Sequence, residues 1–221
     1  MQVNDVLALK IAVAAALVGT LFINYLANKL PINGLSQGDV SDSLPNLFAP
    51  AGITFSIWGI IYLMLSVFTV FQFGLGGQTP SANLLGAIRV LFILNALANM
   101  AWIFAWHYRK FEISVVLMGA ILLTLILIHL ELDKITLTAL EKIVFRLPFS
   151  LYFAWITVAA VANVTALLVA RGWNRFGMTE QSWAVIMLTV AAVIGIVTML
   201  VRRDIAYGLV FIWAYIGILI K

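Results

Sequence analysis

Seven long apolar segments constrain this chain more than any other feature of its sequence. A helix needs ~20 mostly apolar residues to cross the ~30 Å hydrocarbon core of a bilayer. The segments are long and continuous, whereas the strands of a membrane β-barrel are runs of about ten alternating residues. We therefore predict an all-α integral membrane protein with about seven transmembrane helices, the last of which is short for a full span. The predicted spans are residues 6–28, 47–73, 83–106, 113–130, 143–170, 181–201 and 205–220.

The composition agrees with a membrane protein. Of the 221 residues, 64% are hydrophobic and 10% are charged, and the mean hydropathy is +1.10. Soluble domains average roughly 25% charged residues, so a soluble enzyme is excluded. The chain contains no cysteine, which excludes disulfides and thiolate metal sites. The 13 Lys and Arg residues are scattered singly or in pairs, which is typical of side chains that face lipid headgroups, and we expect no nucleic-acid partner. Across seven spans they divide seven to six, so charge does not orient the protein.

Two connections between the predicted spans are informative, one because it is long and the other because it is very short. The loop at residues 29–46 is long and polar, and loops of this size are often lids over binding sites, although a solvated linker is the alternative. Pro45 and Pro50 each restrict φ, so the strip between them is expected to form a rigid shoulder, with Pro50 in the first turn of the second helix. Residues 34–43 are expected to stay mobile. The connection at residues 202–204 is so short that the last two helices should be antiparallel neighbours.

Ionisable residues are missing from the centres of the predicted spans. Because such groups mark proton relays, voltage sensors and retinal sites, their absence argues against all three classes. The lysine nearest to the middle of the last span is Lys221, the final residue. His107 and His129 close consecutive spans and should therefore lie at opposite faces of the membrane, so they cannot share a metal ion. We assign no metal ligand and no catalytic residue.

Three predicted spans carry aromatic residues at helical spacing, and two of these faces also carry asparagines. A buried carboxamide in hydrocarbon needs a hydrogen-bond partner, so helix–helix contacts and interfacial aromatic belts are one explanation. The other explanation is an uncharged pocket between the second, third and fifth helices, which suits a large flat apolar ligand such as a tetrapyrrole or a sterol. The candidate ligand-binding residues are Pro50, Phe55, Trp58, Tyr62, Asn95, Asn99, Trp102, Tyr152, Trp155 and Asn163.

The second predicted helix and the strip before it carry a recognisable pattern. Residues 45–62 read PNLFAPAGITFSIWGIIY, in which Pro45, Pro50, Trp58 and Tyr62 have the spacing of the signature of the tryptophan-rich sensory protein (TspO/MBR, or translocator protein) family. The chain resembles this family further at Leu94-Asn95 and at Leu147-Pro148. It departs from the pattern at Leu47, Ala49 and Thr54, where the family has Trp, Pro and Phe. The resemblance covers residues 1–170 as a five-helix bundle with a lid loop at 29–46, and residues 171–221 would add two further transmembrane helices.

The resemblance implies a pocket under the first loop that binds porphyrins or sterols, in a protein that is often a homodimer. It also implies light-dependent degradation of protoporphyrin in some members, through tryptophans of the second and fifth helices. Trp58 matches the first of these, and Tyr152 replaces the second. Three hypotheses follow: a sensor or carrier for a porphyrin-like or sterol-like ligand, a light-dependent tetrapyrrole-degrading enzyme, and a ligand-free membrane scaffold or assembly factor. No cofactor is assigned beyond a porphyrin or haem-like tetrapyrrole as ligand, and the expected location is the cytoplasmic membrane of a prokaryote.

Overall fold

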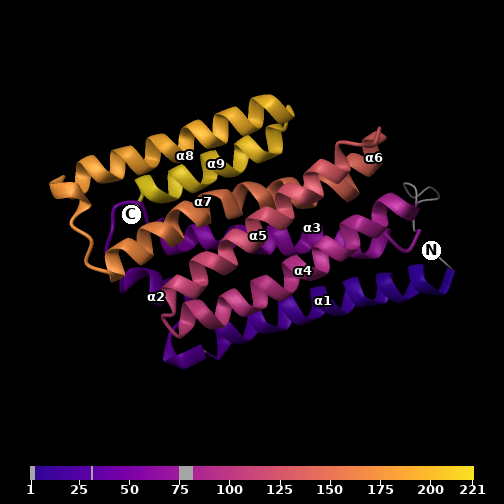
Figure 1. The fold of residues 1–221 in the computed structure, drawn as a ribbon, viewed down its shortest axis with the longest axis horizontal. Coiled ribbons are helices and arrows are strands. Elements are labelled where there is room, and N and C mark those ends of the chain that lie inside the picture. The colour runs from indigo at the N-terminus through magenta and orange to yellow at the C-terminus, as the bar shows by residue number, and fades with distance from the viewer. Residues whose placement is uncertain (1–2, 31, 75–81) are drawn as a thin grey trace.

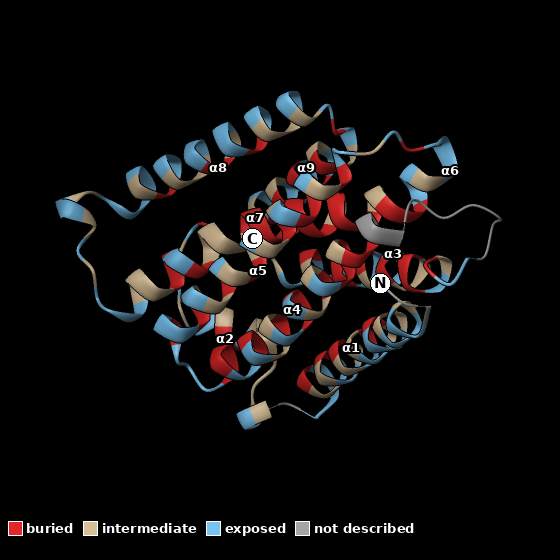
Figure 2. Ribbon diagram, turned by 45° about the vertical axis from the view of Figure 1, so that its right-hand side comes forward, coloured by how far each residue is buried: buried red, intermediate tan, exposed pale blue. Residues whose placement is uncertain are grey.

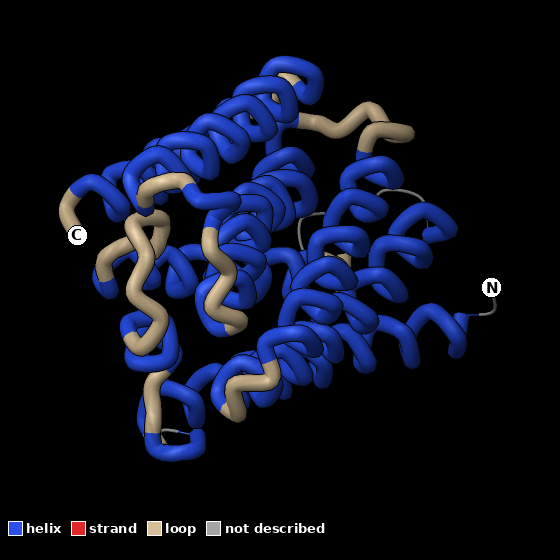
Figure 3. Tube along the Cα trace, turned by 60° about the vertical axis from the view of Figure 1, so that its left-hand side comes forward, coloured by secondary structure: helices blue, strands red, loops and turns tan. Residues whose placement is uncertain are grey.

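The described part of the chain is helical throughout. The computed structural model describes residues 3–30, 32–74 and 82–221, and within these ranges it contains helices and loops but no strand (Figure 3). Residue 31 of the predicted lid loop and residues 75–81 lie outside the described residues. In a bilayer every backbone N–H and C=O must be paired within the protein, and a helix achieves this within one segment. The all-α prediction is therefore confirmed.

Six helical segments are long and apolar enough to cross a membrane. Two of them are composite: the second begins with a 3-10 turn, and the fifth begins with a short helix and a π-helical turn. The seventh segment, α9, is apolar but has only 15 residues, as its short predicted span implied. The elements are α1 (Val3–Lys29), η2 (Gly52–Ser56) with α3 (Ile57–Phe71), α4 (Ala82–His107), α5 (Phe111–Leu132), α6 (Ala139–Glu141) with η3 (Lys142–Arg146) and α7 (Leu147–Ala170), α8 (Glu180–Arg202) and α9 (Ile205–Leu219).

Helix α7 lies at the centre of the bundle. It packs against α3, α5, α8 and α9, while α4 packs between α1 and α5. Helices α1 and α8 lie at opposite edges of the molecule (Figure 1). Burial follows this arrangement, because buried residues are concentrated in the central helices and α8 is largely exposed (Figure 2). An exposed apolar surface of this kind is expected where lipid surrounds the protein.

Helices α8 and α9 form the predicted antiparallel hairpin. Arg203 ends α8 in the left-handed conformation, with φ of 50°, and the Asp204 side chain then accepts a hydrogen bond from the Tyr207 backbone N–H at 3.1 Å. The far end of α9 returns to the start of α3. There the Ala51 N–H donates to the Gly217 carbonyl at 2.8 Å, and Trp213 Nε1 donates to the Thr54 carbonyl at 2.9 Å. The last helix is thereby tied to the segment that precedes α3.

The first loop is more structured than the sequence predicted. A 3-10 turn, η1 (Ile32–Gly34), and a short helix, α2 (Gln37–Asp42), occupy much of the segment expected to be mobile. Ser36 and Asp39 form a capping box at the start of α2, and the hydrogen bonds from Ser36 hold the pKa of the Asp39 carboxyl below its usual value. A capped turn of this kind forms locally, but its contacts with α4 come from the tertiary structure.

Pro50 does not occupy the first turn of the second helix, contrary to the prediction. The helical segment begins at Gly52, and Ala51 is its extended N-cap residue. The physical reason is the hydrogen bond from the Ala51 N–H to α9, which holds the backbone extended at this point. Pro50 itself is buried and belongs to the strip that follows the first loop.

Candidate functional site: an uncharged aromatic cavity

A narrow cavity lies under the first loop, between α2, the start of the second span, α4, α5 and α7. Its volume is about 60 Å³, and none of the residues that line it is charged. Helix α2 and the strip after it form the roof, while side chains of α4 and α7 supply most of the wall. The lining residues are Gln37, Ser41, Asn46, Ala49, Pro50, Phe55, Trp58, Asn99, Trp102, Trp106, Met118, Ile121, Trp155, Ile156, Val158, Ala159, Ala162, Asn163 and Ala166.

Seven of the ten residues that the sequence singled out line this cavity, namely Pro50, Phe55, Trp58, Asn99, Trp102, Trp155 and Asn163. The other three, Tyr62, Asn95 and Tyr152, do not reach its surface. Tyr62 and Tyr152 pack behind Trp58, and Asn95 points to a different helix. The cavity is also lined by three polar residues of the roof that the sequence did not single out, Gln37, Ser41 and Asn46. Their only signal was membership of a long polar loop beside an aromatic helix.

Asn99 joins three helices through its carboxamide. Its Nδ2 donates to the Tyr152 hydroxyl of α7 at 3.0 Å, and its Oδ1 accepts from Asn24 Nδ2 of α1 at 3.2 Å. All three side chains are buried. Asn24 was not anticipated, because its partner on α4 could not be known from the sequence of α1. The sequence places Asn99 in a pocket between the second, third and fifth spans; its hydrogen bonds reach the fifth span, α7, and also the first span, α1.

Asn163 joins the wall of the cavity to α5. Its Oδ1 accepts from Trp102 Nε1 at 3.3 Å, and its Nδ2 donates to Ser114 Oγ at 2.9 Å. The Trp102 ring also stacks on Trp106, with ring centroids 5.7 Å apart. One amide therefore supplies the acceptor for a buried indole N–H and also bonds the Ser114 hydroxyl, which itself donates to the Phe111 carbonyl at 2.9 Å.

Asn95 lies elsewhere than predicted. It is buried, but its Nδ2 donates to the Ile121 carbonyl at 3.1 Å and to Thr124 Oγ1 at 2.8 Å, both on α5. It therefore links α4 to α5 and does not face the second or fifth span. Asn95 and Asn99 are one turn apart, and the crossing of α4 between its neighbours gives them different partners.

Trp58 is at the centre of an aromatic cluster. Its ring stacks on Tyr62 at 5.2 Å and meets Tyr152 and Trp155 edge-on at 5.6 and 6.3 Å. One face of the indole is thus covered by Tyr62. Its Nε1 is buried and has no hydrogen-bond partner within the described residues. The carboxamides of Asn95 and Asn163 are both bonded to other groups.

The roof is attached to α4 by hydrogen bonds near the end of that helix. Trp106 Nε1 donates to the Gln37 carbonyl at 3.3 Å, and Asn33 Nδ2 donates to the His107 carbonyl at 3.1 Å. At its outer edge Lys221 pairs with Asp42 at 2.7 Å. The His107 ring is buried, and its Nδ1 donates to the Ile103 carbonyl, since a carbonyl can only accept. Across the described ranges no three His, Asp or Glu side chains gather as metal ligands would.

These features define the class of protein. Six apolar helices have spanning length, and four of them line an uncharged aromatic cavity that is closed by a polar loop, so this is a multi-pass integral membrane protein. The chain belongs to the family described as TSPO-like protein, whose family model matches residues 10–221. No curated protein and no solved structure matches the chain at a significant level. The family match runs through α8 and α9, and the division of the chain at residue 170 stays a prediction.

Proposed function

We propose that this TSPO-like membrane protein binds a flat apolar ligand, of tetrapyrrole or sterol type, in the cavity beneath the first loop, as a sensor or carrier. The observation that supports this most is the chemistry of the wall. Four indole rings and two carboxamides of the membrane spans face one cavity that has no charged residue, namely Trp58, Trp102, Trp106, Trp155, Asn99 and Asn163. Indole rings stack on flat polycycles, and a small number of fixed polar groups orients them.

The size of the cavity requires the roof to move. Sites that enclose drug-sized ligands have volumes of roughly 300–1,000 Å³, and this cavity has about 60 Å³. A polycycle therefore enters only when α2 and the strip after it move away from α4. Two hydrogen bonds and one exposed ion pair hold the roof at its edges. Each hydrogen bond is worth about 0.5–1.5 kcal/mol and the ion pair less than about 1 kcal/mol. Val40 of α2 and Phe48 of the strip are also buried, at about 1.5–3 kcal/mol each, so displacement of the roof requires a ligand that itself buries a large apolar area.

The unpaired N–H of Trp58 gives the proposed ligand a polar requirement. A buried donor without a partner destabilises the empty protein, and an acceptor on the ligand would remove that penalty. Tetrapyrroles and sterols both carry oxygen atoms that can accept a hydrogen bond. The homodimer and the prokaryotic cytoplasmic membrane remain parts of the proposal that rest on the family resemblance.

The test is an absorbance titration of the purified protein with protoporphyrin, first in the dark and then under light. Trp58→Ala should weaken binding by more than tenfold, or ~1.4 kcal/mol, whereas Trp58→Phe should keep most of it because the aromatic face survives. Trp183→Ala is the matched control, since Trp183 packs against Trp173 and does not line the cavity.

The same titration separates the competing functions. Irreversible bleaching under light that disappears in Trp58→Phe would indicate the tetrapyrrole-degrading enzyme. A spectrum that none of the variants alters would remove the cavity from consideration and leave the scaffold. Ligand flux into proteoliposomes would distinguish a carrier from a sensor.

A further inference from the structure

A second hollow lies at the other end of the bundle from the aromatic cavity. It is a groove of about 490 Å³ between η3, the start of α7 and the turn that joins α8 to α9. Figure 1 shows α6, which directly precedes η3, and α2, which roofs the aromatic cavity, at opposite ends of the molecule. Four cationic side chains line the groove together with two other polar residues, and these six are Lys142, Arg146, Arg202, Arg203, Ser150 and Asp204.

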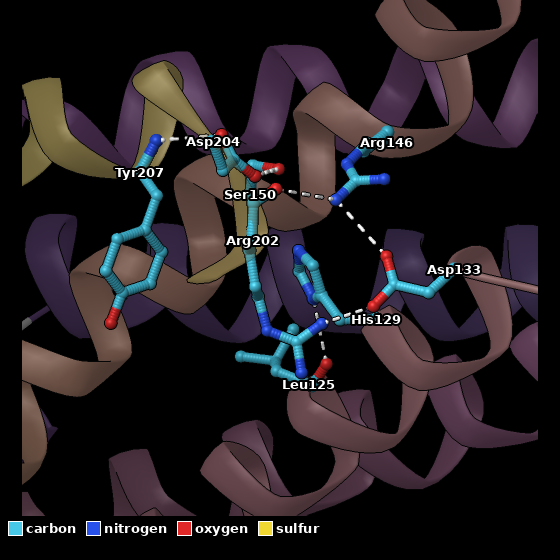
Figure 4. A network of polar contacts seen from close by, with 8 residues as sticks. All are labelled: Leu125, His129, Asp133, Arg146, Ser150, Arg202, Asp204 and Tyr207. Atoms are coloured by element: carbon cyan, nitrogen blue, oxygen red, sulfur yellow. Dashed lines mark hydrogen bonds and ion pairs between the residues drawn. The ribbon is translucent and has the colours of Figure 1, made fainter. Parts of the chain in front are cut away.

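A shared carboxylate holds two of the cations in place. Asp133, at the end of α5, accepts from Arg202 Nη1 at 2.6 Å and from Arg146 Nη2 at 3.2 Å (Figure 4). Arg146 Nη2 also lies 3.5 Å from the Arg202 carbonyl. The single Asp133 carboxylate therefore pairs with two guanidinium groups that come from different helices. Each guanidinium has five N–H donors in a rigid fork, so both keep donors that Asp133 does not use.

The second carboxylate of the groove, that of Asp204, is already hydrogen-bonded within the protein. The Asp204 side chain accepts from Ser150 Oγ and from the Tyr207 backbone N–H, where it caps α9 (Figure 4). The nearby Glu141 does not line the groove, and its carboxylate accepts from the Thr138 side chain and backbone at 2.8 Å. With four cations and two carboxylates, Asp133 and Asp204, the groove carries a net charge of about +2 at neutral pH.

Two of the cations have no partner within the part of the chain that the structure describes. Lys142 and Arg203 are exposed, and neither makes an ion pair or a side-chain hydrogen bond there. Lys142 and Arg146 are four residues apart at the ends of the π-helical turn, and both line the groove. Arg203 sits in the left-handed conformation that ends α8, which brings it to the same groove.

The groove also has an apolar border. Ile143 and Ile205 line it and are 52% and 76% exposed. They lie beside the cations at the end of membrane-spanning helices, where a lipid headgroup and its acyl chains meet the protein. Isolated Lys and Arg residues near helix ends reach the headgroup region individually, whereas a basic pocket between transmembrane helices can hold one anionic headgroup.

We propose that this groove binds a phosphate group, with an anionic phospholipid as the occupant that its apolar border favours. The unpaired Lys142 and Arg203 would contact the phosphate oxygens directly. Arg146 and Arg202, oriented by Asp133, would supply further donors, because guanidinium groups bind phosphate through paired N–H bonds. This site is separate from the aromatic cavity and does not depend on the function proposed for it.

The test measures the stabilisation of the purified protein in neutral detergent micelles by added lipid or phosphate. Thermal unfolding is followed with increasing phosphatidylglycerol, with phosphatidylcholine, and with inorganic phosphate against chloride at matched ionic strength. Lys142→Gln and Arg203→Gln should each weaken the apparent affinity for phosphatidylglycerol about fivefold, and the double variant about twenty-five-fold, since each cation near an anionic surface contributes about 1 kcal/mol. Lys134→Gln is the matched control, because Lys134 lies outside the groove and is paired with Glu131 at 2.6 Å.

Each result decides the proposal. Saturable stabilisation by phosphatidylglycerol that phosphatidylcholine and inorganic phosphate do not reproduce, and that the two groove variants weaken, supports a lipid site. Saturable stabilisation by inorganic phosphate that the same variants weaken supports a site for soluble phosphate. The proposal is overturned if neither anion is preferred over its control, or if Lys134→Gln has the same effect as the groove variants.

Discussion

The hydrogen bond between Asn99 and Tyr152 provides a sharp test of the packing around the cavity. Asn99→Leu keeps the size of the side chain but removes the donor to the Tyr152 hydroxyl and the acceptor for Asn24 Nδ2. Asn24 keeps its bond to the Thr20 carbonyl at 2.9 Å, so it is not left without a partner. The Tyr152 hydroxyl makes no other side-chain hydrogen bond within the described ranges, and the residue is 3% exposed. The main penalty is therefore a buried hydroxyl without a partner.

The magnitude follows from that difference. An orphaned buried polar group costs about 1–3 kcal/mol, whereas hydrogen bonds measured between membrane helices average about 0.6 kcal/mol and reach about 1.7. We expect Asn99→Leu to destabilise the protein by about 1–2 kcal/mol. In a Tyr152→Phe background the same substitution should cost about 0.6–1.7 kcal/mol less, because the hydroxyl that it orphans is already absent.

The assay is a double-mutant cycle on unfolding in mixed micelles with increasing dodecyl sulfate. The matched cycle uses Asn95→Leu with Tyr152→Phe. Asn95 is bonded to α5 and shares no partner with Tyr152, so this pair should be additive to within about 0.5 kcal/mol. A coupling energy near zero for Asn99 and Tyr152, or an equal one for Asn95, would refute the reasoning.

Three further predictions concern the last helix and the roof. Gly217→Ala should destabilise the protein by about 1–3 kcal/mol in thermal unfolding, because a β-carbon there would overlap Thr54, whereas Gly119→Ala meets open space and should be neutral or slightly stabilising. Trp106→Phe removes the donor to Gln37, so amide protection of α2 should fall while that of α8 is unchanged. Hydrogen bonds with Ser36 lower the pKa of the Asp39 carboxyl in the folded protein. The cap therefore stabilises α2 fully above the unfolded pKa of about 4, and this stabilisation is lost as the pH falls through the lower folded pKa. Protection factors of α2 should be constant from neutral pH to about pH 5 and decrease below it, and Asp39→Asn should remove this dependence.

Much of the candidate site could be predicted from the sequence, for a physical reason. Helical periodicity places Asn99, Trp102 and Asn163 on faces that can only turn toward other helices or lipid, and a carboxamide in lipid has no partner. Helical periodicity does not distinguish Asn99 from Asn95. Both lie on one face of α4, but α4 packs between α1 and α5, so one turn along the helix changes the neighbour. Only the tertiary structure assigns Asn95 to α5 and Asn99 to α1 and α7.

The sequence by itself determined that the chain is a bundle of membrane-spanning helices. Long uncharged apolar segments can enter hydrocarbon only if each satisfies its own backbone hydrogen bonds, and that requirement is local. Tertiary structure decided what the local rule leaves open. It brought Tyr152 and Trp155 of α7 against Trp58 of α3, docked α2 on α4 as the roof of the cavity, and brought Arg146 and Arg202 to one carboxylate. Each of these contacts joins residues from different elements. It therefore depends on the angles at which the helices cross and on how deeply they pack, which no single segment encodes.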